Sequence, residues 1–168
     1  KTLSRIVTSF IGPHRMPMII LDSENVIKDR ALFSARGAGI LGFSLFGSQR
    51  LFALDDKMDL QMGQLLSFLE NHQNDRVLLF GFTYMVYQHF YRALLKSGFR
   101  IDLSNAVLIH GGGWKSMERE SMSAIEFKAK LKEVCGITEV YDYYGMAEQT
   151  GSIFMECKEG HLHAPVYA

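Results

Sequence analysis

Residues 143–151, Tyr-Tyr-Gly-Met-Ala-Glu-Gln-Thr-Gly, bring several groups capable of chemistry into one short stretch. An aromatic ring can stack on a flat heterocycle, and a carboxylate such as that of Glu148 is a ligand that Mg²⁺ prefers. Residues 139–143 alternate as a strand does, so Gly145 comes where a strand leaves its sheet. Because ligands bind at that edge of α/β sheets, the stretch indicates a ligand site.

A second glycine-rich segment, residues 110–116 (His-Gly-Gly-Gly-Trp-Lys-Ser), directly follows the apolar run 106–109. Three consecutive glycines remove every side chain that would obstruct a flat ligand. A Walker A loop needs glycine immediately before its Lys-Ser pair, and Trp114 stands there, so a P-loop nucleotide hydrolase is excluded. We interpret His110 as a hydrogen-bonding residue of this loop rather than as a general base.

A third glycine pattern, residues 37–42, matches the dinucleotide-binding fingerprint G-x-G-x-x-G letter for letter. That fingerprint requires a strand before it and a helix after it. Here a helical pattern over residues 25–36 precedes the glycines and a strand-like run, 43–46, follows them. We therefore expect a flexible turn or a close backbone approach rather than a dinucleotide site.

The elements expected along the chain place the site segments at strand ends. Buried strands are predicted at residues 18–21, 77–80 and 106–109, and a further strand at 139–143. Helices are predicted at residues 25–36, from Asp55 and Asp56 to about residue 71, at 82–96 with Gly98 beyond its end, and at 121–134 with Gly136 beyond its end. This order predicts an α/β fold with a mainly parallel sheet flanked by helices on both faces. Gly112 and Tyr144 should then meet at one edge of the sheet.

The end of the chain has a different pattern. Two short alternating runs, residues 152–156 and 162–167, predict a C-terminal β-hairpin. We assign residues 1–151 to an α/β portion and residues 152–168 to the start of this hairpin or of a small β subdomain. Cys157, His161 and His163 raise the alternatives of a zinc site and of hairpin residues that pack on the sheet.

The composition sets broader limits. The 168 residues are 48% hydrophobic and 21% charged, which is typical of a globular domain. Lys plus Arg and Asp plus Glu both total 18, so no net charge would attract nucleic acid or an anionic membrane. No apolar run approaches the roughly 20 residues of a membrane span, and the opening segment lacks the apolar core of a signal peptide. The 2 cysteines favour a reducing, cytoplasmic location.

Residues 144–148, Tyr-Gly-Met-Ala-Glu, resemble the Tyr-Gly-x-Thr-Glu signature of the adenylate-forming enzymes. Extended through residues 149–163, the pattern is most similar to the acyl-protein synthetase component of the bacterial bioluminescence fatty-acid reductase, with phenylacetate-CoA ligases as close relatives. Ala147 departs from the signature threonine, whose hydroxyl contacts the α-phosphate. Gln149 and Thr150 are alternative donors from the same loop.

The resemblance implies ATP-dependent activation of a long-chain fatty acid, or another carboxylic acid, as an acyl-adenylate. The acyl group would then pass to a protein cysteine on an acceptor protein or reductase. The implied cofactors are ATP and Mg²⁺. The implied residues are Tyr144 on one face of adenine; Gly111, Gly112 and Gly113 at its edge; Gly145, Gln149 and Thr150 beside the nucleotide; Glu148 as catalytic metal ligand; and Phe82, Tyr84 and Met85 in the acyl pocket.

The resemblance also implies parts that this sequence does not contain. The loop that grips the β- and γ-phosphates should precede Lys1, and the ribose aspartate and the lid domain with its lysine should follow Ala168. We therefore expect the large N-terminal domain of an adenylate-forming enzyme in part, inactive alone and able to self-associate through the apolar stretch 43–52. Two alternatives stay open: an acyl- or aryl-CoA ligase, which differs in its thiol acceptor, and a non-catalytic remnant or interaction module.

Overall fold

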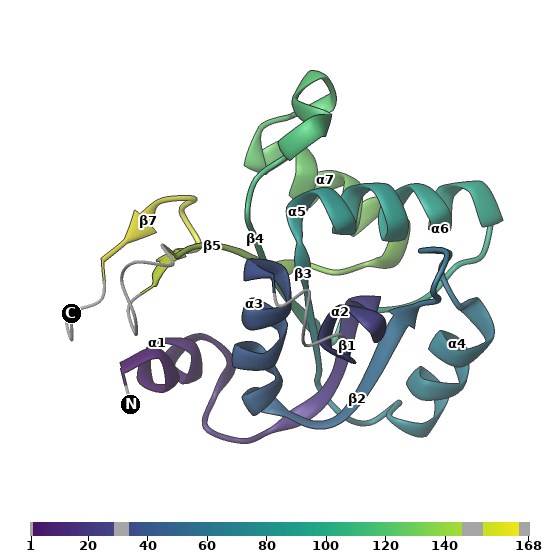
Figure 1. The fold of residues 1–168 in the computed structure, drawn as a ribbon, viewed down its shortest axis with the longest axis horizontal. Coiled ribbons are helices and arrows are strands. Elements are labelled where there is room, and N and C mark those ends of the chain that lie inside the picture. The colour runs from purple at the N-terminus through teal and green to yellow at the C-terminus, as the bar shows by residue number, and fades with distance from the viewer. Residues whose placement is uncertain (1, 29–33, 146–152, 165–168) are drawn as a thin grey trace.

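The computed structural model describes residues 2–28, 34–145 and 153–164. One seven-stranded sheet has the order β2-β1-β3-β4-β5-β6-β7 (Figure 1). Strands β1 to β5 are parallel, and β6 and β7 are antiparallel to their neighbours. The strands are β1 (Met16–Ser23), β2 (Gly47–Leu54), β3 (Val77–Phe82), β4 (Ala106–Gly111), β5 (Glu139–Tyr144), β6 (Phe154–Glu156) and β7 (Leu162–His163).

Helices connect the parallel strands. They are α1 (Thr2–Ile11), α2 (Asn25–Lys28), α3 (Ala35–Phe43), α4 (Met62–Asn71), α5 (Thr83–Met85), α6 (Arg92–Ser97) and α7 (Ala124–Cys135). Two 3₁₀-helices, η2 (Ser44–Phe46) and η4 (Lys115–Glu120), and a π-helical turn, η3 (Val86–Tyr91), complete the described part of the chain. None of the described helices has the length and apolar character needed to cross a membrane.

Helices cover both faces of the sheet because the central strands are apolar on both sides. Ile20 and Phe80 face one core together with residues of α1 and α3, whereas Ile19 and Leu79 face a second core with α4, η3, α6 and α7. This alternation is the period-two pattern of a strand buried on both faces. The predicted α/β class, with helices on both faces of a mainly parallel sheet, is confirmed.

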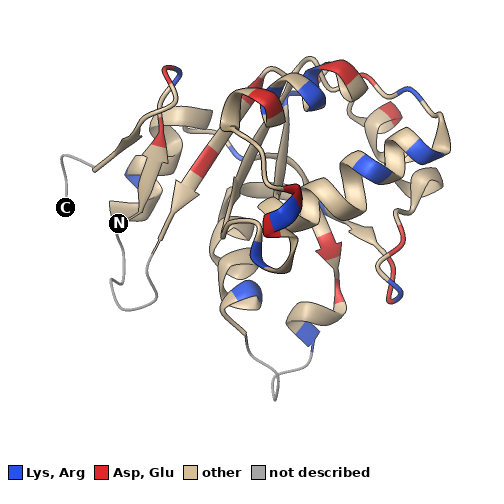
Figure 2. Cartoon of the chain, turned by 90° about the horizontal axis from the view of Figure 1, so that it is seen from above, with Lys and Arg blue, Asp and Glu red and all other residues tan. Residues whose placement is uncertain are grey.

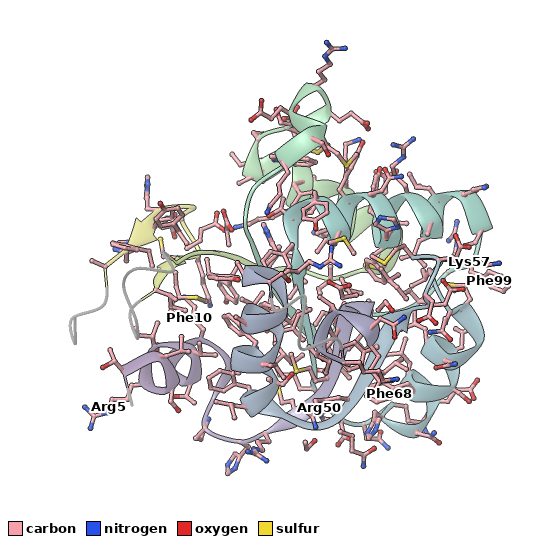
Figure 3. The ribbon with its side chains drawn as sticks, in the orientation of Figure 1. Arg5, Phe10, Arg50, Lys57, Phe68 and Phe99 are labelled. Carbon is pink, nitrogen blue, oxygen red and sulfur yellow. The ribbon has the colours of Figure 1, made fainter. Side chains whose placement is uncertain are left out.

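Helix α1 closes one side of the first core. Its Phe10 lies with its ring edge against Tyr141 of β5, at 5.2 Å between ring centroids, and Figure 3 labels Phe10 on this helix. Arg76, just before β3, donates to the carbonyl of Ile11 at 3.1 Å and to Glu139 at 2.6 Å. These contacts join the start of the chain to β5, although the sequence pattern did not predict α1.

The strand order reverses at β1. The chain passes from β1 to β2 on one side and then returns to β3 on the other side of β1. In doubly wound sheets, such a reversal generally leaves a crevice outside the carboxyl ends of the two strands between which the chain changes direction, here β1 and β3. We call the edge that contains the carboxyl ends of β1 to β5 the carboxyl edge.

Several predicted elements are present with shifted ends. The strands predicted at 18–21, 77–80, 106–109 and 139–143 are each contained in a longer strand. Gly98 and Gly136 end α6 and α7 in the left-handed conformation, with φ of 67° and 76°. The C-terminal hairpin is present as β6 and β7, and β6 pairs with β5, so the hairpin extends the main sheet.

The prediction for residues 37–46 was wrong in its local structure. Gly37, Gly39 and Gly42 lie inside helix α3, and Ser44–Phe46 is a 3₁₀-helix rather than a strand. Two of these glycines have a packing role: a β-carbon on Gly37 would lie 2.9 Å from the carbonyl oxygen of Val26, and one on Gly39 would lie 3.2 Å from the Phe82 ring. The close approach expected of these glycines is therefore made from a helix.

Two other local predictions need correction. Asp55 does not open a helix; its carboxylate accepts from the backbone of Lys57 and Asp59 in a turn, and α4 begins at Met62. Within the apolar stretch 43–52, Phe43 and Phe46 are buried, whereas Leu45 is 63% exposed. Self-association through this stretch stays a prediction, and Leu45 is the most exposed large hydrophobic residue in it.

Candidate functional site

The two glycine segments lie next to each other on the carboxyl edge. In the parallel pair β4–β5, Gly111 stands opposite Tyr143. Gly112, which follows β4, and Tyr144, the last residue of β5, therefore lie at the same end of the sheet. This confirms the predicted meeting of the two segments, and it follows from strand register rather than from loop conformation.

The three glycines after His110 have different surroundings. Gly111 is the last residue of β4, and a β-carbon there would lie 2.7 Å from Cε1 of Tyr143. Gly112, with φ of 80°, would bring a β-carbon to 2.7 Å from Cδ1 of Phe82. Gly113, with φ of 67°, has open space on that side. Of the three glycines expected to offer bare backbone, only Gly113 is uncovered in this way.

Tyr144 offers the aromatic surface on the neighbouring strand. Its residue surface is 52% exposed, and its ring centroid lies 6.2 Å from that of Phe154 in β6. Gly145 follows it, and a β-carbon there would lie 3.2 Å from Ile153. The other proposed residues of this segment, Glu148, Gln149 and Thr150, lie outside the described residues, as does Ala147.

The three expected acyl-pocket residues are not equally accessible. Met85 is 1% exposed inside the first core, and Phe82 is 8% exposed between Gly39 and Gly112. Tyr84 is half-buried, and its hydroxyl accepts a hydrogen bond from Nη1 of Arg36 at 3.1 Å. Tyr84 is thus the residue of this group that has surface available to a ligand.

His110 ties the base of the glycine segment to β3. Its Nδ1 lies 3.0 Å from Oγ1 of Thr83, and the Thr83 hydroxyl donates to the carbonyl of Gly111 at 3.1 Å. Burial, and then the nearby Lys128, lower the pKa of His110 to about 3. The imidazole is therefore neutral near pH 7. This agrees with the predicted hydrogen-bonding role and not with a base that charges during a reaction.

Two acidic residues that the sequence pattern did not identify, Asp142 of β5 and Glu156 of β6, lie close together two residues from the paired Tyr144 and Phe154. Glu156 of β6 is 3% exposed; its Oε2 accepts from the Asp142 N–H at 3.0 Å, and its Oε1 pairs with Lys128 at 2.9 Å. Burial, and then the charge of Glu156, raise the pKa of Asp142 to about 6. The alternating pattern of residues 152–156 predicted a strand, but nothing in the neighbouring sequence predicts that Glu156 is buried and forms an ion pair with Lys128 of α7.

In the cartoon of Figure 2, Lys and Arg residues and Asp and Glu residues are both distributed over several of the described elements. No three His, Cys, Asp or Glu side chains of residues 2–28, 34–145 and 153–164 are grouped to hold a metal ion. Cys157, His161 and His163 are all described, and their side chains are not gathered into such a group. The N–H of Cys157 instead donates to the carbonyl of His161 across the hairpin, at 2.9 Å.

A separate polar cleft of about 620 Å³ opens at the carboxyl ends of β1 and β2. Asp56 lies on its wall and accepts from the side chains of Ser23 at 3.3 Å and Asn25 at 2.6 Å. The sequence analysis did not predict this cleft, because its residues come from two strand ends without a shared motif. It adds polar surface to the same edge as the glycine segment.

The chain is a doubly wound α/β protein, a class in which ligands bind at the carboxyl edge, and here that edge carries open glycine backbone and an exposed tyrosine. No curated protein sequence matches the chain, and no solved structure matches it either. The family model described as acyl-protein synthetase, LuxE, matches residues 1–168. The chain belongs to this acyl-protein synthetase family, which confirms that part of the resemblance stated above.

Proposed function

We propose that this chain takes part in ATP-dependent activation of a long-chain fatty acid as an acyl-adenylate, followed by transfer of the acyl group to a cysteine thiol of a protein. Membership of the acyl-protein synthetase family supports the overall activity. The observation that carries the nucleotide step is the pairing of Gly111 with Tyr143, because it brings the segments that contain Gly113 and Tyr144 to the same carboxyl edge. We place the reaction in the cytoplasm.

The adenine ring fits the surface between these two residues. Gly113 has no side chain and open space on its β-carbon side, and Tyr144 has half its surface free. An aromatic ring stacked on adenine contributes about 1 kcal/mol beyond simple burial. The backbone groups of the glycine segment can then read the edge of the base without obstruction.

The chemistry requires two anions to approach each other. A carboxylate oxygen of the acid attacks the α-phosphorus, a new phosphorus–oxygen bond forms, and pyrophosphate leaves. A cysteine thiolate then attacks the acyl carbon, and AMP leaves. We assign Glu148 to hold Mg²⁺, which neutralises phosphate charge, and Gln149 and Thr150 to donate to the α-phosphate. Tyr84, with Phe82 and Met85 behind it, is our proposed boundary of the acyl site.

Trp114 provides a direct test of nucleotide binding, since it is the single tryptophan of the chain and follows Gly113. MgATP should change its emission, and Tyr144→Ala should weaken that response about fivefold through loss of stacking. Phe99→Leu, at an exposed aromatic residue just beyond α6, is a control that should bind as the wild type does. An unchanged emission together with no heat of binding in calorimetry would overturn the nucleotide step.

The acyl transfer needs its own assay, in the protein that carries this chain. ATP, Mg²⁺ and radiolabelled tetradecanoate should yield AMP, pyrophosphate and acyl groups that resist denaturation but are released by neutral hydroxylamine, as thioesters are. Coenzyme A in place of an acceptor protein should not accelerate AMP release. Acceleration by coenzyme A would show an acyl-CoA ligase, and no AMP in either case would show a non-catalytic protein.

A further inference from the structure

A buried carboxylate lies near the carboxyl end of β1, the strand at which the strand order reverses. Asp22, near the end of β1, is 1% exposed. Its Oδ2 lies 3.1 Å from Nε of Arg36, yet none of the described residues gives this oxygen a hydrogen bond of good geometry. Burial raises the pKa of Asp22, and the charge of Arg36 opposes that rise. The carboxylate thus holds Arg36 mainly through its charge.

Arg36 links the carboxyl ends of β1 and β3. While Nε faces Asp22, Nη1 donates to the hydroxyl of Tyr84, directly after β3, at 3.1 Å. The Arg36 side chain remains 34% exposed. It belongs to the first turn of α3, which Ser34 caps, so the positive end of the helix dipole adds to its charge.

Lys115 reaches the same tyrosine from the glycine segment. Its Nζ lies 5.8 Å from the centroid of the Tyr84 ring. Lys115 has a φ of 50°, in the left-handed region that residues other than glycine rarely occupy. Gly112 and Gly113 before it also have positive φ, of 80° and 67°, so the backbone folds back and directs Lys115 over β3. No carboxylate in the described ranges is within ion-pair distance of Lys115.

We propose that Arg36 and Lys115, brought together at Tyr84, form a binding site for an oxyanion, a carboxylate or a phosphate, at the carboxyl ends of β1 and β3. Two cations that share one tyrosine are balanced by a single buried carboxylate, and the tyrosine offers a hydroxyl beside them. A bound oxyanion supplies the missing negative charge and accepts charge-assisted hydrogen bonds. The position is one where α/β sheets bind ligands.

This inference rests on the proposed function and makes it more specific. Both substrates of that reaction carry the required chemistry: the fatty acid has a carboxylate and ATP has a polyphosphate. The site lies at the carboxyl ends of β1 and β3, whereas the adenine surface proposed for Gly113 and Tyr144 lies at the ends of β4 and β5. The site would therefore hold a group other than the base. Octanoate and inorganic pyrophosphate separate the two sources, because each carries one of these groups alone.

Calorimetry of both anions with the whole chain tests the proposal. At least one should bind the wild type, and Lys115→Gln should weaken that binding at least about tenfold through loss of a charged contact. Lys96→Gln is the matched control, since Lys96 is an exposed lysine at the end of α6, away from the carboxyl edge. It should leave binding within about twofold. Equal weakening by both variants, or no binding of either anion, overturns the site.

The role of Arg36 is tested through its partner Tyr84. Substitution of Arg36 itself would leave Asp22 buried without a cation and would destabilise the fold. Tyr84→Phe keeps the ring beneath Lys115 and removes the hydroxyl that holds Arg36. It should weaken anion binding about threefold or more, with an unchanged melting temperature. Unchanged anion affinity in this variant would remove Tyr84 and the position of Arg36 from the proposal.

Adenosine separates this inference from the nucleotide proposal, because it carries the base without any phosphate. If adenosine changes Trp114 emission while neither anion binds, the adenine surface stands and the oxyanion site is wrong. If an anion binds in a manner dependent on Lys115 while adenosine and ATP have no effect, the oxyanion site stands and the nucleotide step is wrong.

Discussion

A β-carbon on Gly111 would lie 2.7 Å from Cε1 of Tyr143, so the tyrosine ring packs directly over the glycine. The same ring is stacked with Phe80, at 6.0 Å between centroids, and tilted against Phe43 at 4.9 Å. Tyr143 therefore anchors β5 to β4 and to the first core. Its neighbour Tyr144, on the opposite face of the strand, keeps about half of its surface exposed.

Gly111→Ala should lower the free energy of unfolding by about 3 kcal/mol, because the added methyl group has no room without movement of β5. Gly113→Ala is the control: it has space for the methyl group but pays about 1 kcal/mol for a left-handed backbone. Urea denaturation of both variants measures the difference. Equal losses would show that Tyr143 does not determine the residue at position 111.

Tyr143→Ala and Tyr144→Ala should separate stability from binding. We expect the first to cost about 3 kcal/mol of unfolding free energy, since a large ring leaves the core. The second should change stability by no more than about 0.5 kcal/mol and reduce ATP affinity about fivefold. Thermal denaturation and Trp114 fluorescence give the two readouts. Loss of stability in Tyr144→Ala without loss of binding would contradict the assignment.

The raised pKa of Asp142, to about 6, predicts a pH-dependent stability. Because the folded carboxyl keeps its proton above the ordinary value of 3.8, its favourable contribution is complete below about pH 4 and is lost as the pH rises through 6. The unfolding free energy of the wild type minus that of Asp142→Asn should therefore fall between pH 4 and pH 6. Neighbouring His110, Lys128 and Glu156 are present in both proteins. A difference that rises with pH would refute the shift.

Glu156→Gln should affect both stability and this titration. The neutral amide replaces the charged acceptor of the Asp142 N–H and removes the ion pair with Lys128. We expect the free energy of unfolding to fall by about 1 to 3 kcal/mol. The pKa of Asp142 should move down, because the charge that helps to raise it is gone. Carbon-13 NMR of the Asp142 carboxyl measures the titration. The exposed Glu159→Gln on the same hairpin should change neither property.

Glu148→Gln tests the proposed metal contact. It should leave folding nearly unchanged and slow adenylate formation by roughly 10²-fold or more, since the metal stabilises charge that grows in the transition state. Pyrophosphate exchange into ATP, measured in the protein that carries this chain, reports that step. Exchange at the wild-type rate would exclude Glu148 from the mechanism.

The central strands could be predicted because each is a short apolar run buried on both faces. Strand β2 was not predicted, since it is an edge strand whose first half is mostly exposed and polar. The proximity of the two glycine segments could also be predicted. Once β4 and β5 are parallel neighbours, their carboxyl ends lie at one edge of the sheet, so the residues after Ile109 and after Tyr143 come close together there. The partnership of Arg36, Tyr84 and Lys115 could not be predicted, because it joins three segments far apart in sequence.

The glycines of α3 explain why residues 37–42 were predicted to form a turn although they lie in a helix. Glycine is among the weakest helix formers, so Gly37, Gly39 and Gly42 argued against a helix. In the fold, Val26 and Phe82 approach α3 too closely for larger side chains. Tertiary packing thus outweighs the local preference, and this packing is invisible in a single sequence.

The π-helical turn η3 fixes the rotational phase of the segment on either side of it. Upstream, Thr83 donates to the carbonyl of Gly111; downstream, Leu94 is 1% exposed in the second core. Each residue of an α-helix turns the chain by about 100°. A π-helical turn takes up about one residue more than an α-helical turn, so deleting one residue from Val86–Tyr91 would convert it to an ordinary turn and keep both anchors in phase. The wide turn thus absorbs an additional residue without moving Thr83 or Leu94 from its partner, and the glycine segment keeps its attachment to this helix.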